Sequence, residues 1–283
     1  MTQPETPARA CPEPAEAPAG AGAEPPGAPA GAPRELRNRY TAADLAVCTG
    51  DEASRFIPQG DGDPRGDMVL AWELLYRLEP ELYDRLVSAE RLHPGVLAWL
   101  LRNVERIVEV GAGTGRLTLE LIDRAREVVA VEPAAPLRRL LDRKLARADH
   151  RCRVQVTHGF FDDLPVPDDC ADVVVACSAL TPAPGHGGEA GLAEMERVCR
   201  PGGRVVIVWP NNIAWLAAHG YRYESFAGEM FVEFASLEEA VELIEVFHPS
   251  AVTEVRRRGR REVPFEVLGI NPPRDLAFKA MAR

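Results

Sequence analysis

Three glycines in a short run are the residues whose spacing most directly suggests chemistry. Gly111, Gly113 and Gly115 alternate with two other small residues, directly after an apolar stretch at 107–110. Glycine allows backbone dihedral angles that other residues avoid, and it allows a ligand to lie directly against the main chain. In an α/β sheet, ligands bind at a turn of this kind between a strand and a helix. The run therefore predicts a ligand site at the end of the first strand.

The spacing of the glycines and one acidic residue discriminate between two classes of ligand. Dinucleotide-binding loops use G-x-G-x-x-G, which seats a pyrophosphate on a helix N-terminus. Here the third glycine comes one residue early, and Arg116 stands where it would belong. S-adenosylmethionine has no phosphate but has a ribose with two hydroxyls, and Glu132, directly after the apolar stretch 128–131, can accept both through one carboxylate. The pattern favours S-adenosylmethionine over a nicotinamide dinucleotide.

The elements that must position these residues alternate between strand and helix from residue 107 onward. Apolar runs predict five strands, followed or separated by helical patterns. The strands are expected at 107–110, 128–131, 154–156, 172–177 and 204–209, and the helices at 117–125, 137–146 and 191–198. This alternation is typical of a parallel sheet covered by helices on both faces. Right-handed crossovers bring the carboxyl ends of all these strands to one edge of the sheet. We therefore predict a doubly wound α/β domain over residues 107–283.

The flanking segments differ in composition and pattern. Residues 1–34 are almost entirely Pro, Ala, Gly and Glu, so burial cannot offset their ordering entropy, and a disordered tail is expected. Residues 35–106 show helical periodicity broken by Gly and Pro, which predicts an N-terminal helical lid segment. Beyond the fifth strand, residues 211–234 are expected to complete the lid, and residues 235–247 to form a helix. Residues 252–258 and 275–281 are expected as closing strands, while 262–268 stays open between strand and loop.

At four points in order the chain resembles the class I S-adenosylmethionine-dependent methyltransferases, in the broad group that includes the ubiquinone and menaquinone biosynthesis methyltransferases. The resemblance spans about residues 83–209 and rests on stretches 109–115, 129–133, 159–173 and 197–204. It implies a Rossmann-like seven-stranded sheet of order 3-2-1-4-5-7-6 with strand 7 antiparallel. One departure occurs where the family has an acid after Gly159, because Phe160 stands there. Asp162 is the expected substitute at the adenine, with Phe161 as an apolar wall.

The resemblance also implies the cofactor and its binding residues. S-adenosyl-L-methionine is the expected cofactor, with Glu109 shaping its methionine end and Tyr83 close to it. The full set of predicted cofactor-binding residues is Glu109, Gly111, Ala112, Gly113, Gly115, Glu132, Pro133, Phe161, Asp162 and Ser178. No catalytic residue is assigned. A methyl transfer that must remove a proton can use a general base, for which the sequence offers His158, His186 and His219. Each of these three also fits an ordinary loop or surface histidine.

Composition restricts the partners that the chain can have. The formal net charge of −10 argues against general binding of nucleic acid, which rests on clustered positive charge. The one dense basic run, residues 256–261, fits a solvated strand end or hairpin, or alternatively a dock for an anionic partner. The six cysteines form no C-x-x-C pair and have no zinc-ligand spacing, so reduced thiols and no metal are expected. No apolar stretch reaches the roughly 20 residues of a membrane span, and no signal segment is recognisable, which favours a cytoplasmic location.

The function predicted from these features is transfer of a methyl group from S-adenosylmethionine to a small-molecule acceptor. Aromatic residues that could line the acceptor pocket are Trp72, Tyr76, Tyr83, Trp215, Tyr221 and Tyr223. The tripeptide 271–273 has the N-P-P of base-modifying methyltransferases but not its position or aromatic ending, and is interpreted as a loop. Two alternatives remain open. One is a methyltransferase-like protein that binds the cofactor as a regulatory or scaffolding module, and the other is an NAD-dependent dehydrogenase.

Overall fold

The structure is a computed structural model that describes residues 35–48, 55, 63–100 and 104–282. The expectation of a disordered tail concerns residues 1–34, which lie outside the described residues, as do Cys11 and parts of the expected lid at 49–54, 56–62 and 101–103. All of the described residues belong to one compact unit, residues 33–283.

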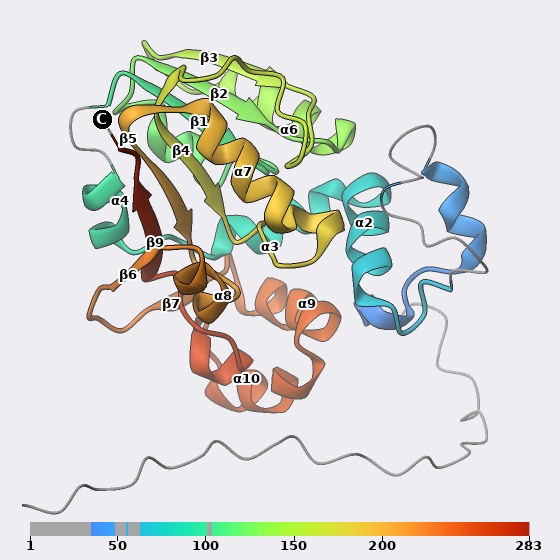
Figure 1. Cartoon of the computed structure of the whole chain (residues 1–283). Coiled ribbons are helices and arrows are strands. Elements are labelled where there is room, and N and C mark those ends of the chain that lie inside the picture. Colours follow the sequence, from blue (N-terminus) through green and yellow to red (C-terminus); the bar gives the residue numbers. More distant parts are fainter. Residues whose placement is uncertain (1–34, 49–54, 56–62, 101–103, 283) are drawn as a thin grey trace, which may run out of the picture. The chain divides into compact units, whose positions relative to one another are not determined.

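A seven-stranded sheet forms the centre of this unit (Figure 1). Its strands are β1 (Arg106–Val110), β2 (Glu127–Val131), β3 (Arg153–Thr157), β4 (Ala171–Cys177), β5 (Cys199–Val208), β6 (Arg222–Ser225) and β9 (Asp275–Ala280). Their order is β3-β2-β1-β4-β5-β9-β6, with parallel pairing from β3 to β5 and β9 antiparallel to both of its neighbours. Because β9 is the seventh strand of this sheet, the predicted order 3-2-1-4-5-7-6 with an antiparallel seventh strand is confirmed.

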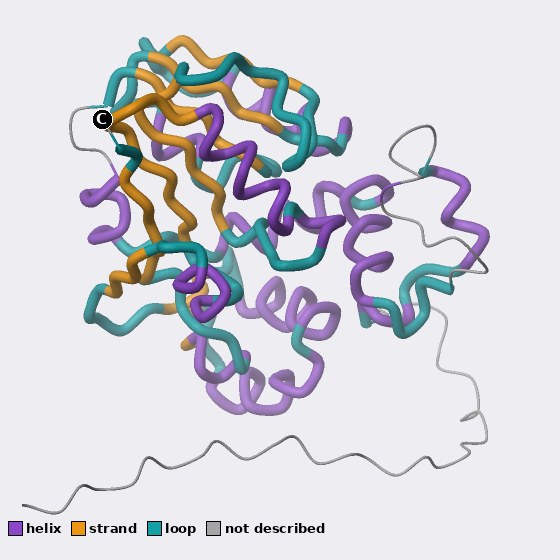
Figure 2. Tube along the Cα trace, viewed as in Figure 1, coloured by secondary structure: helices purple, strands orange, loops and turns teal. Residues whose placement is uncertain are grey.

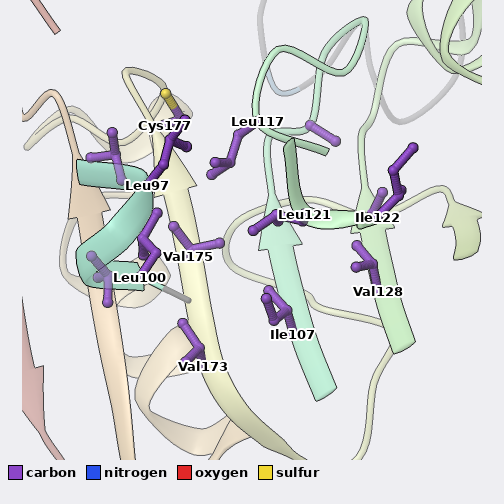
Figure 3. Packing of buried hydrophobic residues seen from close by; sticks show 14 of the residues in the cluster. Leu97, Leu100, Ile107, Leu117, Leu121, Ile122, Val128, Val173, Val175 and Cys177 are labelled. Carbon is purple, nitrogen blue, oxygen red and sulfur yellow. The ribbon is translucent and has the colours of Figure 1, made fainter. Parts of the chain in front are cut away.

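Helices cover both faces of the sheet, so its central strands are buried on both sides (Figure 2). Alternate residues of each strand point to opposite faces, as the pleat requires. One face carries α4 (Pro94–Leu100), α5 (Thr118–Leu121) and α6 (Ala135–Leu145), and the other carries α7 (Gly188–Val198) and α8 (Ile213–Ala218). Figure 3 shows the first face, where Leu97 and Leu100 of α4 pack near Val175 of β4.

The N-terminal helices divide into two groups. α2 (Met68–Leu78) begins at Asp67, whose carboxylate accepts hydrogen bonds from the Val69 and Leu70 backbone N–H groups, as an N-cap does. α3 (Pro80–Ala89) follows directly, and both helices contact α6. Two short 3₁₀ helices, η1 (Leu36–Asn38) and η2 (Ala42–Val47), pack on α2. In contrast, α4 belongs to the core of the sheet and not to this outer layer.

An insertion between β6 and β9, residues 226–274, forms a small α/β unit with a hydrophobic cluster of its own. We call these residues the C-terminal insertion. It consists of β7 (Phe231–Glu233), α9 (Leu237–Phe247), η4 (Pro249–Ala251), α10 (Val252–Arg258), β8 (Glu262–Pro264) and η5 (Phe265–Leu268). Strands β7 and β8 pair with each other in a separate two-stranded sheet. Two glutamates of α9 form ion pairs with Arg85 of α3, at 2.6 and 2.9 Å.

The prediction of a strand at 252–258 is wrong, because this segment is the helix α10. Val252 and Val255 lie on one face of that helix, and Gly259 ends it in the left-handed conformation at φ 62°. Glu254 forms ion pairs with Arg257 and Arg258 at 2.6 and 2.7 Å, the spacing that supports a helix. The sixth strand of the sheet is instead β6, which lies in the segment 211–234 that was expected to form only part of a lid.

Smaller differences concern the ends of elements. The helix expected at 117–125 is only the short α5, followed by turns. The fifth strand, expected at 204–209, begins earlier, because β5 starts at Cys199 and its register with β4 shifts before Arg204. The segment 262–268, left open above, is β8 followed by η5. Among the described helices, none is both long and apolar enough to cross a bilayer.

Candidate functional site

A large cavity opens at the carboxyl edge of the parallel strands. Its volume is about 920 Å³, near the upper end of the roughly 300–1,000 Å³ usual for ligand pockets. The wall consists of the ends of β1, β2, β4 and β5, one face each of α2 and α3, and the last part of the C-terminal insertion. Seven of the predicted cofactor-binding residues line it, namely Gly111, Gly113, Glu132, Pro133, Phe161, Asp162 and Ser178.

The glycine loop after β1 has the backbone that its sequence suggested. Gly111, Gly113 and Gly115 have φ angles of 74°, 57° and 97°, which favour glycine. A Cβ atom on Gly111 would lie 2.9 Å from the Ala179 Cβ, and one on Gly113 would lie 3.3 Å from the Tyr83 hydroxyl. The first two glycines therefore keep the space between the loop and its neighbours open. Gly115 faces the core instead, because a Cβ there would lie 2.5 Å from Cδ1 of Leu141.

Glu132, directly after β2, is the carboxylate nearest to this loop. Its Oε2 accepts a hydrogen bond from the Gly113 N–H at 2.9 Å, and its Oε1 accepts one from the Ala134 N–H at 2.8 Å. The side chain lines the cavity although the residue is only 5% exposed. Burial raises the pKa of the Glu132 carboxyl to about 7, against the opposing effect of the two backbone N–H groups. A carboxylate is thus held beside the glycine loop, with room for ligand hydroxyls.

Two neighbouring phenylalanines and an acid extend the wall after β3. Phe161 approaches the glycine loop, since a Cβ on Gly111 would lie 3.3 Å from its ring. The Asp162 carboxylate forms an ion pair with Arg55, whose guanidinium also lies 4.1 Å from the centre of the Phe160 ring. Asp162 therefore has a cationic partner in this structure. Ser178, just after β4, has the unusual φ of 55° for a residue other than glycine.

The remaining predicted cofactor residues do not line the cavity. Ala112 is buried in the loop, and Glu109 lies in the core, where its Oε2 accepts a hydrogen bond from the Thr118 hydroxyl at 2.6 Å. Burial raises the pKa of the Glu109 carboxyl to about 8. This carboxyl bonds to Thr118 inside the protein, at the start of the helix that follows the glycine loop.

The outer wall of the cavity comes from α2 and α3. Tyr76 and Tyr83 pack edge to face, with ring centres 4.9 Å apart, and Trp72 lies 6.0 Å from Tyr76. All three line the cavity. Arg116, which follows the glycine loop, is buried and bonds through Nη1 to Oε2 of Glu90 at 2.9 Å. This ion pair joins the end of α3 to the start of the helical turn after β1.

Comparison with known proteins identifies the domain. Residues 107–203 match the family described as a methyltransferase domain. An uncharacterized methyltransferase of Mycobacterium tuberculosis is 32% identical over 134 residues, 45% of this chain and 50% of that protein. An uncharacterized methyltransferase of Geobacillus kaustophilus is 28% identical over 124 residues, 44% of this chain and 51% of that protein. The chain carries a class I methyltransferase domain.

The chain spans about half the length of the relatives it matches. Among solved structures, a SAM-dependent O-methyltransferase of Thermotoga maritima is 15% identical, with a TM-score of 0.43, covering 69% of this chain and 67% of that one. The placement among the ubiquinone and menaquinone methyltransferases stays a prediction.

The three histidines offered as bases lie in different places around the methyltransferase domain. His186 lines the cavity, with Nε2 3.7 Å from Oε1 of Glu73. His158 packs edge to face on Phe160 and is not part of the cavity wall. His219 directly follows α8, and its Nε2 contacts Glu189 at 2.6 Å. The hydrogen bond to the Trp215 carbonyl and the contact with Glu189 raise the pKa of its imidazole. The structure therefore brings only His186 to the cavity.

The C-terminal half contributes several cavity residues that were not predicted from the sequence. Among them are Trp209, His248, Ile270, Asn271 and Asp275. Of the aromatic residues predicted for the acceptor pocket, Trp215, Tyr221 and Tyr223 do not line it. The position of Trp209 in the sequence could have indicated its role. It directly follows the fifth strand, at the edge where ligands bind in such sheets.

The basic run 256–261 does not reach the cavity. Arg256 forms an ion pair with Glu245 of α9, and Arg261 bonds to Glu262 at 2.9 Å. Glu254 forms ion pairs with Arg257 and Arg258, so four of the five arginines in the run have a carboxylate partner. The run fits the solvated alternative, although as a helix end and not as a strand. In the described part of the chain, no group of three or more His, Cys, Asp or Glu side chains is arranged to hold a metal ion.

Proposed function

We propose that the chain is an S-adenosylmethionine-dependent methyltransferase that transfers a methyl group to a small-molecule acceptor. The observation that carries the proposal is Glu132, a buried carboxylate held by the Gly113 and Ala134 N–H groups at the wall of the cavity. An ionised carboxylate has four acceptor positions, so two remain for the hydroxyls of a ribose. The match of residues 107–203 to a methyltransferase domain supports the same assignment.

The residues present fit this cofactor. Gly111 and Gly113 leave open the space in which a Cβ atom would meet Ala179 or Tyr83. Phe161 offers an apolar surface for the adenine, with Asp162 as the polar group beside it, and Pro133 and Ser178 complete this part of the wall. Glu109, Ala112 and Gly115 would act from behind the loop, by fixing its path. When bound, S-adenosylmethionine supplies a methyl group that is already activated by its positively charged sulfur.

The protein therefore contributes mainly orientation and the exclusion of water. The rings of Trp72, Tyr76 and Tyr83 cover one side of the cavity and present mostly apolar surface. In this proposal α2 and α3 would serve as part of the lid. His186 is the histidine that could receive a proton, because it lies at the cavity wall beside Glu73.

The alternative of a binding module without catalysis predicts a cofactor site and no space for an acceptor. The cavity instead continues past the glycine loop to Trp209, Asn271 and Asp275. Its volume of about 920 Å³ is at the upper end for one ligand, which favours a site for two.

Calorimetric titration of the full chain with S-adenosylmethionine, S-adenosylhomocysteine and NAD tests the proposal. Both adenosyl ligands should bind with micromolar or tighter affinity, and NAD should bind at least tenfold more weakly. A matched control is the variant Asp142→Asn, which removes an exposed carboxylate that does not line the cavity. Absence of micromolar binding of either adenosyl ligand would contradict the proposal. Binding without release of S-adenosylhomocysteine, over a panel of amines, phenols, quinones and carboxylates, would favour the scaffolding alternative.

A further inference from the structure

The part of the cavity beyond β4 has a different character from the part around the glycine loop. It is walled by the residues that follow β5, by the end of the C-terminal insertion and by the start of β9. These residues are Trp209, Pro210, Asn211, Gly269, Ile270, Asn271 and Asp275. In the order β1-β4-β5-β9, this region lies two to three strands from β1, which is about 10–14 Å along the sheet edge. We call it the β5–β9 end of the cavity.

A buried carboxylate with one unused oxygen lies at the β5–β9 end. Asp275 is 9% exposed, and its Oδ2 accepts a hydrogen bond from the Tyr223 hydroxyl at 2.9 Å. Its Oδ1 is buried and has no hydrogen-bond partner among the described residues. Buried polar atoms are almost always paired, and leaving one unpaired costs about 1–3 kcal/mol. Because an ionised carboxylate only accepts hydrogen bonds, the missing partner has to be a donor.

The neighbouring aromatic residue is held rigidly beside this carboxylate. The backbone N–H of Trp209 donates to the Asp275 carbonyl at 3.0 Å, and its indole Nε1–H donates to the Asn271 carbonyl at 2.9 Å. Trp209 has a φ of 51°, a conformation that costs energy for a residue with a side chain. Strain of this kind is concentrated at ligand sites, where the surrounding contacts maintain it.

The charge of Asp275 at the β5–β9 end is negative and is offset in part by the neighbouring Arg274, whose guanidinium donates to the Gly228 carbonyl at 3.1 Å. The two arginines that line the cavity are both engaged, Arg55 with Asp162 and Arg116 with Glu90. Arg116 also lies over the Trp209 ring, 5.2 Å from its centre. A group that donates a hydrogen bond and carries positive charge would complement Asp275, since charge-assisted hydrogen bonds are about twice as strong as neutral ones. An oxyanion formed from a hydroxyl would be repelled there.

We propose that the acceptor of the methyltransferase is a primary or secondary amine whose N–H donates to Oδ1 of Asp275. This inference rests on the methyl transfer proposed above. The bound ammonium first gives one proton to the Asp275 carboxylate, which later loses it to water. The nitrogen, now neutral, uses its lone pair to form the C–N bond, while the C–S bond breaks and its electron pair stays on sulfur, so that the product leaves as the methylated ammonium. Trp209 and Ile270 form the apolar wall for the body of the amine.

The variant Asp275→Asn tests this assignment, because it removes the charge and keeps the shape and an oxygen that can bond to Tyr223. Asp142→Asn is the matched control, as it makes the same change of charge on an exposed face of α6. The probes are arylalkyl amines and their hydroxyl analogues, such as 2-phenylethylamine and 2-phenylethanol. Binding is measured by calorimetry on the full chain saturated with S-adenosylhomocysteine, and turnover by release of S-adenosylhomocysteine from S-adenosylmethionine.

Amines should bind at least tenfold more tightly than their hydroxyl analogues to the wild-type chain and to Asp142→Asn. In Asp275→Asn, amine affinity should fall at least tenfold and the KM for amines should rise, while affinity for S-adenosylhomocysteine stays unchanged, which also shows that the variant folds. The inference is wrong if no amine of the panel is preferred over its hydroxyl analogue, or if Asp275→Asn leaves amine affinity and KM unaltered. If the wild-type chain fails to bind S-adenosylhomocysteine at all, the proposed function itself is contradicted.

Discussion

Two buried glutamates lie near the glycine loop, and their different surroundings give them different roles. Glu109 lies in β1 and Glu132 directly follows the neighbouring strand β2, and both have pKa values raised by burial. They differ in what they face, because Glu132 lines the cavity and Glu109 bonds to Thr118 inside the protein. The same side chain thus serves a ligand in one case and the packing of the loop in the other.

The charge on Glu132 should make cofactor affinity depend on pH. With a pKa of about 7, the carboxyl gains a proton as the pH falls from 8 to 5.5, and it then loses acceptor capacity for the ribose hydroxyls. Affinity for S-adenosylhomocysteine, measured by calorimetry, should therefore fall about tenfold or more over this range. In Glu132→Gln the affinity should be about 10- to 100-fold lower at pH 8 and nearly independent of pH. A wild-type affinity that stays constant between pH 5.5 and 8 contradicts the ribose role.

Glu109 should make folding stability depend on pH in a defined direction. Its pKa is about 8 in the folded chain and about 4.3 in an unfolded chain, so the folded state binds the extra proton between these values. The stabilisation is complete below about pH 4.3 and is lost as the pH rises toward 8, at up to about 1.4 kcal/mol per pH unit. Glu109→Gln should reduce this loss by about 2–3 kcal/mol between pH 5.5 and 7.5. The free energy of unfolding is measured with urea at several pH values, with Glu120→Gln at an exposed position as the control. If it depends on pH equally in both variants, the raised pKa of Glu109 is contradicted.

At the scale of elements, what the sequence allows one to predict follows from local physics. The strands β1, β2, β4 and β5 were recognisable because strands buried on both faces consist of nearly continuous apolar runs. The edge strand β3 is less buried and was recognisable from Val154 and Val156, which alternate with a polar residue. The edge strand β6, Arg222–Ser225, is mostly exposed and has no such run, so it was not recognised. The helix α10 was misread as a strand because β-branched residues open it, while its clearer signal is Gly259, the left-handed glycine that ends it.

Some residues of the site could likewise be predicted from local sequence, and others could not. Gly111, Gly113 and Glu132 come from loops next to recognisable strands, so their proximity follows from the parallel order of the sheet. Asp275 and Trp209 lie 66 positions apart and meet only because β9 pairs antiparallel with β5. The helix pair α2 and α3 reaches the cavity through packing on α6. Contacts of that kind depend on the assembled fold, and no local pattern predicts them.

Gly115, between β1 and the following helical turn, should not accept a residue with a side chain. A Cβ there would lie 2.5 Å from Cδ1 of the buried Leu141, at a φ of 97°. Gly115→Ala should therefore destabilise the chain by about 2–4 kcal/mol, the sum of overpacking and backbone strain. The matched control is Gly259→Ala, whose φ is 62° and whose Cβ would meet no atom within 4 Å. It should cost only about 1 kcal/mol. Denaturant unfolding of the two variants gives the comparison, and equal losses would show that Leu141 moves away without cost.

At the scale of the whole described unit, three separate parts of the chain form one cavity. The strand ends and loops of the sheet supply the glycines and Glu132, α2 and α3 supply the aromatic cover, and the C-terminal insertion and β9 supply the β5–β9 end. Two sets of ion pairs hold these parts together, from Arg85 of α3 to α9 and from Glu90 to Arg116. A ligand that contacts the sheet and α3 at the same time should therefore stabilise the fold as a whole.

S-adenosylhomocysteine at 100 times its Kd should raise the free energy of unfolding by about 2.7 kcal/mol, because it binds only the folded chain. For a chain of this size that corresponds to an increase in Tm of roughly 5–10 °C. Hydrogen exchange should slow most in α2, α3 and the glycine loop, which line the cavity, and least in α10, which does not. Glu132→Gln at the same ligand concentration should show a smaller shift because its Kd is higher, and so should the wild-type chain with NAD at that concentration. Protection confined to the strand ends, with α2 and α3 unchanged, would mean that these helices do not cover the bound cofactor.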